Sequence, residues 1–188
     1  YSNSFRTDRG TVSTYSGWLS YPVQSLMKET QCHHQLPSIA KSLEAEGYKT
    51  TYLYPGPMTN MGKREYLANM HFNELLDHTA FEPQEINSAW GANDSTSAMK
   101  AFHVIAQKDT TSKWFMAYQT ISSHEPWDVP YHRLSDKVQN AFAYTDHCVG
   151  QFLDSLSRSP LWENLLVVIY ADHGHTYGLT FDQPEFFH

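Results

Sequence analysis

The short motif Asp172-His173-Gly174 is the most informative part of the sequence, because it follows directly on an apolar run of strand length. A carboxylate next to an imidazole is a pair of metal ligands, and a hard oxygen with a borderline nitrogen suits Zn²⁺ or Mn²⁺. Gly174 lets the chain turn immediately after the pair. These three residues alone also fit a polar turn in which Asp172 caps a neighbouring backbone group.

His124 is a second candidate, since it lies in the loop 122–127 after an apolar and aromatic run that ends at Ile121. A single loop histidine is most often a surface residue. If His124 converges with Asp172 and His173, it becomes a candidate proton donor or a partner for a developing oxyanion.

The stretch 3–17 is dense in hydroxyl side chains and contains Arg6, Thr7 and Arg9. A threonine hydroxyl is a poor nucleophile until a metal or a base activates it, so Thr7 needs partners of the kind just described. The alternative is a helix start that is rich in capping Ser and Thr residues.

Helical and strand patterns alternate along the chain, which favours an α/β fold over an all-α or all-β fold. Pro37 in a first turn and Gly47 at the end bound a predicted helix. The β-branched and aromatic run 48–54 that follows is a predicted strand. These residues form the first helix-to-strand unit.

Two further units follow the same order. A helix that starts at Asp94 or Ser95 precedes a strand over 114–121, and a helix over 136–156 precedes a strand over 164–171. The last strand is so apolar that we expect it to be a central parallel strand, buried on both faces. Functional residues of open α/β sheets lie at the carboxyl ends of strands, which is where both candidate loops begin.

The composition excludes several classes of protein. With 13 Lys and Arg against 20 Asp and Glu, the 188-residue chain has a net charge of −7, which argues against a general binder of nucleic acid or anionic membranes. The 40% hydrophobic residues exclude a disordered chain, and no run approaches the roughly 18 to 20 apolar residues of a membrane span.

The cysteines and one histidine pair receive a structural interpretation. Cys32 and Cys148 are too few for a disulfide scaffold, so we expect buried thiols, with a single disulfide as the alternative. His33 and His34 beside Cys32 lack the spacing of metal ligands on a helix face or hairpin, and we interpret them as surface residues.

Taken together, these motifs resemble the sulfatase branch of the alkaline phosphatase superfamily, and within it the lipoteichoic acid synthase and phosphoglycerol transferase group. The resemblance rests on Thr7 followed by Ser16 and Gly17, on His124, on the sequence YTDHCVGQFLDSL and on the Asp-His-Gly motif. It implies an alkaline-phosphatase-like α/β sandwich with a central, mostly parallel sheet flanked by helices. Residues 1–188 would then be one partial catalytic domain, truncated at both ends.

The resemblance also implies a catalytic site. Thr7 would be the nucleophile, and Thr7, Asp172 and His173 would bind one divalent metal ion, Mn²⁺ or Zn²⁺. The family's fourth ligand, an acidic residue on an earlier strand, would precede Tyr1. His124 would contact the phosphoryl group or donate a proton.

Five further residues are candidates for substrate binding. In the family, the segment around residue 60 reads the headgroup, and here Asn60 fits while Met61 replaces a basic residue. The candidates are Arg6, Asn60, Lys63, Arg64 and His175, with solvated surface positions as the alternative for Lys63 and Arg64. His175 is expected beside the metal ligands and not among them.

The implied reaction moves a phosphoglycerol-type group from a phospholipid to a glycan or polyol hydroxyl through a phospho-threonine intermediate. A sulfatase is disfavoured because Thr7 cannot be oxidised to formylglycine, whereas a phosphodiesterase and a non-catalytic binding module both stay open. The substrate would be a phospholipid headgroup or another phosphate or sulfate ester, and no nucleic acid. The family implies the extracytoplasmic face of the cytoplasmic membrane, with an anchor outside this sequence.

Overall fold

The computed structural model describes residues 4–19 and 24–175. These residues form two compact units. The first contains the described residues up to Gly47, together with Thr59–Phe72 and the segment from Val167, and the second contains Tyr48–Met58 and Asn73–Leu166.

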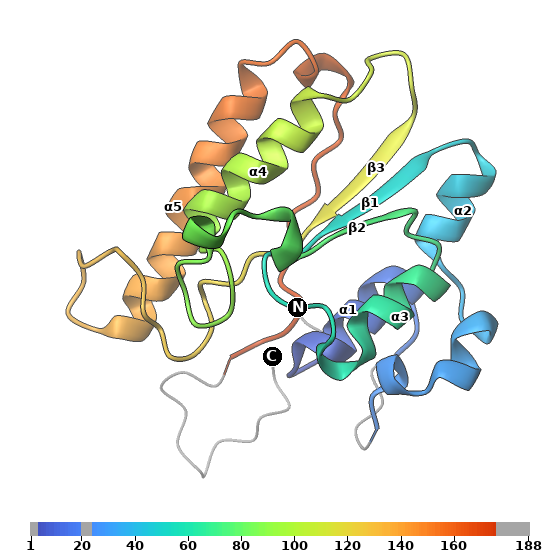
Figure 1. Cartoon of the computed structure of the whole chain (residues 1–188), viewed down its shortest axis with the longest axis horizontal. Helices are drawn as coiled ribbons and strands as arrows, with labels where there is room; N and C mark the ends of the chain where they lie inside the picture. The colour runs from blue at the N-terminus through green and yellow to red at the C-terminus, as the bar shows by residue number, and fades with distance from the viewer. Residues whose placement is uncertain (1–3, 20–23, 176–188) are drawn as a thin grey trace. The chain divides into compact units, whose positions relative to one another are not determined.

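The second unit is built on a parallel three-stranded sheet (Figure 1). Strands β1 (Lys49–Leu53), β2 (Glu74–Leu76) and β3 (Trp114–Tyr118) lie in the order β2-β1-β3, and β1 pairs in parallel with both neighbours. The β-branched and aromatic residues of β1 suit this central position, where four of its five residues are buried.

Two long helices pack beside each other in this unit (Figure 1). Helix α4 (Asp94–Ala106) connects β2 to β3, and α5 (Lys137–Ser157) follows β3. Apolar side chains from the sheet and from both helices share two clusters, which include Leu53, Ala101, Ile105, Met116, Phe152 and Leu156. The helices therefore cover the sheet through their apolar faces.

The regular elements of the first unit, within its described residues, are helices. The unit contains α1 (Thr7–Ser16), α2 (Ile39–Ala45) and α3 (Lys63–Asn69). Ser38 caps α2 by accepting a hydrogen bond from the Lys41 N–H, and its hydroxyl donates to the Met70 carbonyl at the end of α3 (2.6 Å).

Short 3₁₀ helices connect these elements. They span Leu26–Lys28, Thr30–Gln35, Asn60–Gly62, His78–Ala80, Pro83–Glu85 and Trp162–Asn164. Of the helices within residues 4–19 and 24–175, none combines the length and the apolar character that a membrane crossing requires.

The α/β fold with a parallel sheet flanked by helices is confirmed, and so are most predicted elements. Helices α2, α4 and α5 and strands β1 and β3 lie where the periodicity placed them. Helix α4 is capped by Asn93, whose side chain accepts from the Thr96 N–H, and not by Asp94 or Ser95.

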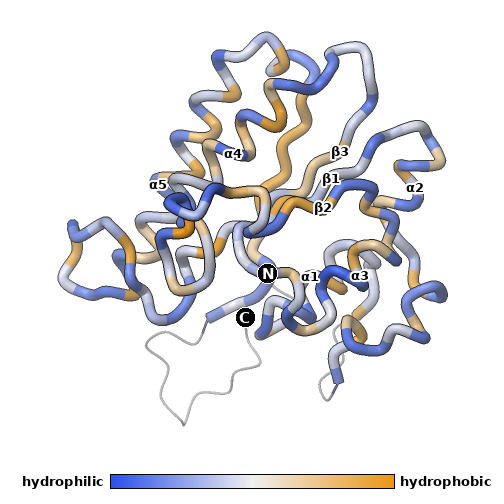
Figure 2. Tube along the Cα trace, in the orientation of Figure 1, coloured by the Kyte–Doolittle hydropathy of each residue, from blue (hydrophilic) through white to orange (hydrophobic). Residues whose placement is uncertain are grey.

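The prediction of a buried central strand over 164–171 was wrong. Residues 165–171 are not a strand in the structure, and Leu166 and Ile169 are 88% and 65% exposed. Figure 2 shows this stretch as hydrophobic. Apolar side chains indicate a preference for burial, but a strand also needs a neighbouring strand for its backbone hydrogen bonds, and an apolar run does not specify one.

The structure also tests the predictions for the two cysteines and for His33. Both thiols are free, Cys148 is buried and Cys32 is half-buried. His33 is buried, which corrects the surface interpretation: one ring nitrogen bonds the Leu26 carbonyl and the other the Asn69 amide, each at 3.0 Å.

Candidate functional site

Thr7 is the first residue of α1, where backbone N–H groups have no partner inside the helix. The first helical hydrogen bond runs from the Gly10 N–H to the Arg6 carbonyl (2.9 Å). Within the described residues the half-buried Thr7 hydroxyl makes no hydrogen bond. The free N–H groups and the helix dipole favour an anion beside this hydroxyl.

The segment 170–174 runs along α1 in the opposite direction. The Tyr170 hydroxyl donates to the Tyr15 hydroxyl (2.9 Å), and the Gly174 N–H donates to the Ser4 carbonyl (3.3 Å). Between these bonds, a Cβ added to Gly10 would lie 2.0 Å from the Asp172 carbonyl oxygen. The Asp172-His173 pair therefore lies against the first turn of α1, which Thr7 begins.

The side chains of Asp172 and His173 fit a shared metal ion. His173 Nδ1 bonds the Gly174 carbonyl (2.6 Å), and Nε2, the candidate ligand atom, lies 4.0 Å from Asp172 Oδ1. Bonds of about 2.0 to 2.2 Å from each atom span this separation. The described residues contain no group of three or more His, Cys, Asp or Glu side chains that could hold a metal. The Thr7 hydroxyl as a further ligand stays a prediction.

Lys63 brings a positive charge to the same place. It is the first residue of α3, is 6% exposed, and is the one buried Lys or Arg among the described residues. Burial lowers the pKa of Lys63 to about 8, while the nearby carboxylates of Asp172 and Asp8 oppose this shift. The structure thus groups Lys63 with one predicted metal ligand and with the first turn of α1.

The other candidate substrate residues are solvent-exposed. Arg6 is the residue before α1 and has an exposed side chain. Asn60 and Arg64 are exposed on the turn before α3 and on its first turn, and His175 is exposed at the end of the described segment. Their roles in substrate binding stay predictions.

His124 belongs to the second unit. It follows the carboxyl end of β3 with an exposed side chain, as the sequence predicted, and its Nδ1 bonds the Glu125 carbonyl (3.0 Å). Its ring also contacts Trp90, with centroids 4.6 Å apart. The convergence of His124 with Asp172 and His173 stays a prediction.

Two features of the site were missed in the sequence. Gly10 in the middle of a predicted helix start was a usable signal, because glycine weakens a helix unless a close contact needs it. The burial of Lys63 had no signal, since burial depends on the packing around α3.

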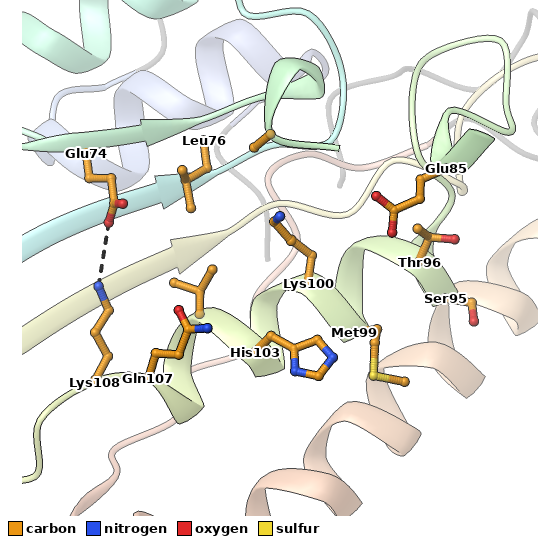
Figure 3. A pocket seen from close by; sticks show the side chains of 12 residues that line it. Glu74, Leu76, Glu85, Ser95, Thr96, Met99, Lys100, His103, Gln107 and Lys108 are labelled. Atoms are coloured by element: carbon orange, nitrogen blue, oxygen red, sulfur yellow. Dashed lines mark ion pairs between the residues drawn. The ribbon is translucent and has the colours of Figure 1, made fainter. Parts of the chain in front are cut away.

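A cavity lies elsewhere in the second unit, away from these residues. It is an open groove of about 860 Å³ between β2 and α4, with Glu74, Leu76, Met99, Lys100, His103 and Lys108 among its lining residues (Figure 3). Glu74 and Lys108 form an ion pair across it at 3.6 Å. None of the predicted site residues lines this groove.

Comparison with known proteins gives one family and several similar folds. The family model described as Sulfatase matches residues 1–184. A protein in the alkaline phosphatase superfamily from Vibrio parahaemolyticus has a similar structure, with a TM-score of 0.76 and 22% identity over 86% of this chain and 41% of its own.

Two transferases are similar in fold. The lipoteichoic acid synthase LtaP from Listeria monocytogenes has a TM-score of 0.77 and 20% identity over 86% of this chain and 43% of its own. The phosphoglycerol transferase GacH from Streptococcus pyogenes, in complex with sn-glycerol-1-phosphate, has a TM-score of 0.64 and 16% identity over 84% and 46%. The chain thus spans less than half the length of these structures, with which it shares an alkaline-phosphatase-like fold.

Proposed function

The chain belongs to the sulfatase family, and we propose that its site at the start of α1 transfers a phosphoglycerol-type group from a phospholipid to an acceptor hydroxyl. The observation that carries this proposal is the contact of the Asp172 backbone with Gly10, because it lays the Asp172-His173 pair against the turn that Thr7 begins. Two proteins of similar fold are named for such chemistry, a lipoteichoic acid synthase and a phosphoglycerol transferase.

In the first step, Thr7 Oγ1 forms a bond to the phosphorus of the headgroup, and the ester bond to the diacylglycerol oxygen breaks. The Thr7 hydroxyl releases its proton to water, and the departing diacylglycerol oxygen gains one, for which His124 is the proposed donor. In the second step the acceptor oxygen forms a bond to the phosphorus and loses its proton, while the bond between Thr7 Oγ1 and the phosphorus breaks and Thr7 Oγ1 gains a proton.

The residues around Thr7 suit a phosphoryl group. The N–H groups of the first turn of α1 and the ammonium of Lys63 are donors for its charged oxygens. Asp172 and His173 would hold a divalent ion, with Thr7 as a further ligand, and such an ion favours the alkoxide and neutralises the phosphoryl oxygens. We place this reaction at the extracytoplasmic face of the cytoplasmic membrane.

The threonine itself favours phosphoryl transfer over sulfate ester hydrolysis. A hydroxyl can form and release a phosphate ester, whereas Thr7 cannot become the formylglycine aldehyde that sulfate ester hydrolysis would need. A phosphodiesterase would share the first step and replace the acceptor by water.

The test uses the natural protein over its whole length. With Mn²⁺ or Zn²⁺ and fluorescent phosphatidylglycerol in vesicles, we expect the parent to release diacylglycerol and to carry a glycerophosphoryl group on the peptide that contains Thr7. Thr7→Ala and Asp172→Asn should abolish both signals. Thr30→Ala and Asp154→Asn, at exposed positions, are the matched controls.

The outcomes separate the competing functions. Formation of free glycerol phosphate in the absence of an added acceptor indicates a phosphodiesterase. Metal binding without release from phosphatidylglycerol contradicts the proposed donor. Absence of metal binding by the whole protein favours a non-catalytic module.

A further inference from the structure

His124 is held by two residues from the segment that leads into α4. We propose that Trp90 and Asp94 are positioning residues for His124, with Trp90 fixing the imidazole and Asp94 fixing the loop that carries it. This inference rests on the proposed function, in which His124 meets the leaving group or the phosphoryl group. All of the contacts that support it lie within the second unit.

Asp94 closes the turn that follows β3. Its side chain is 0% exposed, and its Oδ1 accepts hydrogen bonds from the N–H groups of Ile121 (2.7 Å) and Ser122 (3.1 Å). The Asp94 N–H donates in return to the Ser122 hydroxyl (2.9 Å). These three bonds fix the backbone two residues before His124.

The remaining oxygen of Asp94 joins this turn to α5. Thr145 on α5 donates its hydroxyl to Asp94 Oδ2 (2.6 Å). A buried carboxylate is costly unless donors satisfy it, and here two backbone N–H groups, one hydroxyl and the N-terminus of α4 do so. The carboxylate therefore links α4, α5 and the loop after β3 in one network.

Trp90 acts on the imidazole itself. The indole and imidazole rings meet edge to face, with centroids 4.6 Å apart and planes at 62°. The Glu125 carbonyl accepts from Trp90 Nε1–H and bonds His124 Nδ1 (3.0 Å), so the proton lies on Nδ1. Nε2 of His124 is then the nitrogen that the proposed function would use toward the substrate.

The loop that carries Trp90 is fixed to the end of β1. Gly91 has a φ of 150°, and a Cβ at this position would lie 2.1 Å from the Pro55 carbonyl oxygen. The same oxygen accepts from the Ala92 N–H (3.3 Å). Only glycine allows this approach, and it gives the Trp90 ring a rigid base.

A double-mutant cycle in the whole natural protein tests the inference. We expect Trp90→Phe, which keeps an aromatic ring but removes the N–H donor, to lower kcat about tenfold with little change in KM. In the His124→Ala background the same change should alter kcat less than about twofold, because the group that Trp90 positions is gone. Trp162→Phe, at an exposed position, is the matched control.

Asp94 provides a second, independent arm. Asp94→Ala should lower kcat about 100-fold in the parent and have little effect on the kcat of His124→Ala. Asp94→Asn should restore most of the activity, because its carbonyl can still accept from Ile121 and Ser122 while its amide donates to Thr145. Thermal denaturation shows whether Asp94→Ala is folded. If it is not, the test relies on the Trp90→Phe cycle and on Asp94→Asn.

Equal losses in the two backgrounds would overturn the inference, since they would show that Trp90 and Asp94 act independently of His124. Unchanged turnover in His124→Ala would instead refute the proposed role of His124, and the positioning role with it. The two failures are distinguished by the His124→Ala arm alone.

Discussion

The carbonyl oxygen of Asp172 occupies the space that a side chain at Gly10 would need, 2.0 Å from the position of a Cβ. Gly10 is in the first turn of α1, three residues after Thr7, where alanine would otherwise be preferred. The glycine therefore makes room for the segment that carries the predicted metal ligands, at a cost in helix stability.

Gly10→Ala should separate metal binding from helix stability. The added methyl group would displace the Asp172 backbone, and we expect the affinity for Mn²⁺ to fall at least about tenfold by titration calorimetry. Gly150→Ala in α5, where nothing lies within 4 Å of the added Cβ, is the matched control. It should stabilise the protein by about 0.5 to 1 kcal/mol and leave Mn²⁺ affinity unchanged. Parent-like affinity in Gly10→Ala would contradict the importance of this contact.

Much of the fold could be predicted because, in most elements, the local sequence pattern predicts the same structure that packing stabilises. Helix α5 carries an apolar stripe at helical spacing, and β1 combines β-branched and aromatic residues between turn residues. Strand β2 escaped prediction because three residues are too few for a period to show.

The site was only partly predictable, for a physical reason. The side-chain types of Asp172 and His173 predict a pair of metal ligands. The apolar run before them also predicts a buried strand, but apolarity alone does not show whether another strand is there to pair with it. In the same way, Asp94 or Ser95 was expected to cap α4, whereas the Asp94 carboxylate accepts from the backbone of a turn that lies 27 residues further along the chain. Contacts between segments distant in sequence decide both cases.

The buried ammonium of Lys63 should make stability depend on pH. The pKa of Lys63 is about 8 in the folded chain and 10.5 in the unfolded chain. Between these pH values the unfolded state binds more protons, so the free energy of unfolding rises with pH. Below pH 8 the full cost is present, of the order of 3 kcal/mol.

Urea unfolding of the metal-free protein measures this effect. Lys63→Met should be more stable than the parent below pH 8, and its advantage should shrink as the pH approaches 10.5. Lys41→Met on α2, where the side chain is exposed, relieves no burial and should show no such trend. A constant difference for Lys63→Met would contradict the burial of a charged ammonium.

The two thiols should differ in reactivity. Burial raises the pKa of Cys148 to about 11, so only about 0.1% of it is thiolate near pH 8. Iodoacetamide should therefore label the half-buried Cys32 in the native protein and leave Cys148 unlabelled, and denaturant should expose both. Peptide mass spectrometry measures each site, and equal native rates would refute the packing around Cys148.

The hydrogen bond between Tyr15 and Tyr170 gives a direct test of how the segment 170–174 lies on α1. Tyr15→Phe and Tyr170→Phe each remove one hydroxyl and keep the ring, so the double variant should be more stable than the sum of the single losses predicts. A coupling of about 0.5 to 1.5 kcal/mol in urea unfolding is expected for one such bond. Because the same bond aligns Asp172 with the first turn of α1, both single variants should also weaken Mn²⁺ binding. Strict additivity with parent-like metal affinity would show that the segment is held on α1 by other contacts.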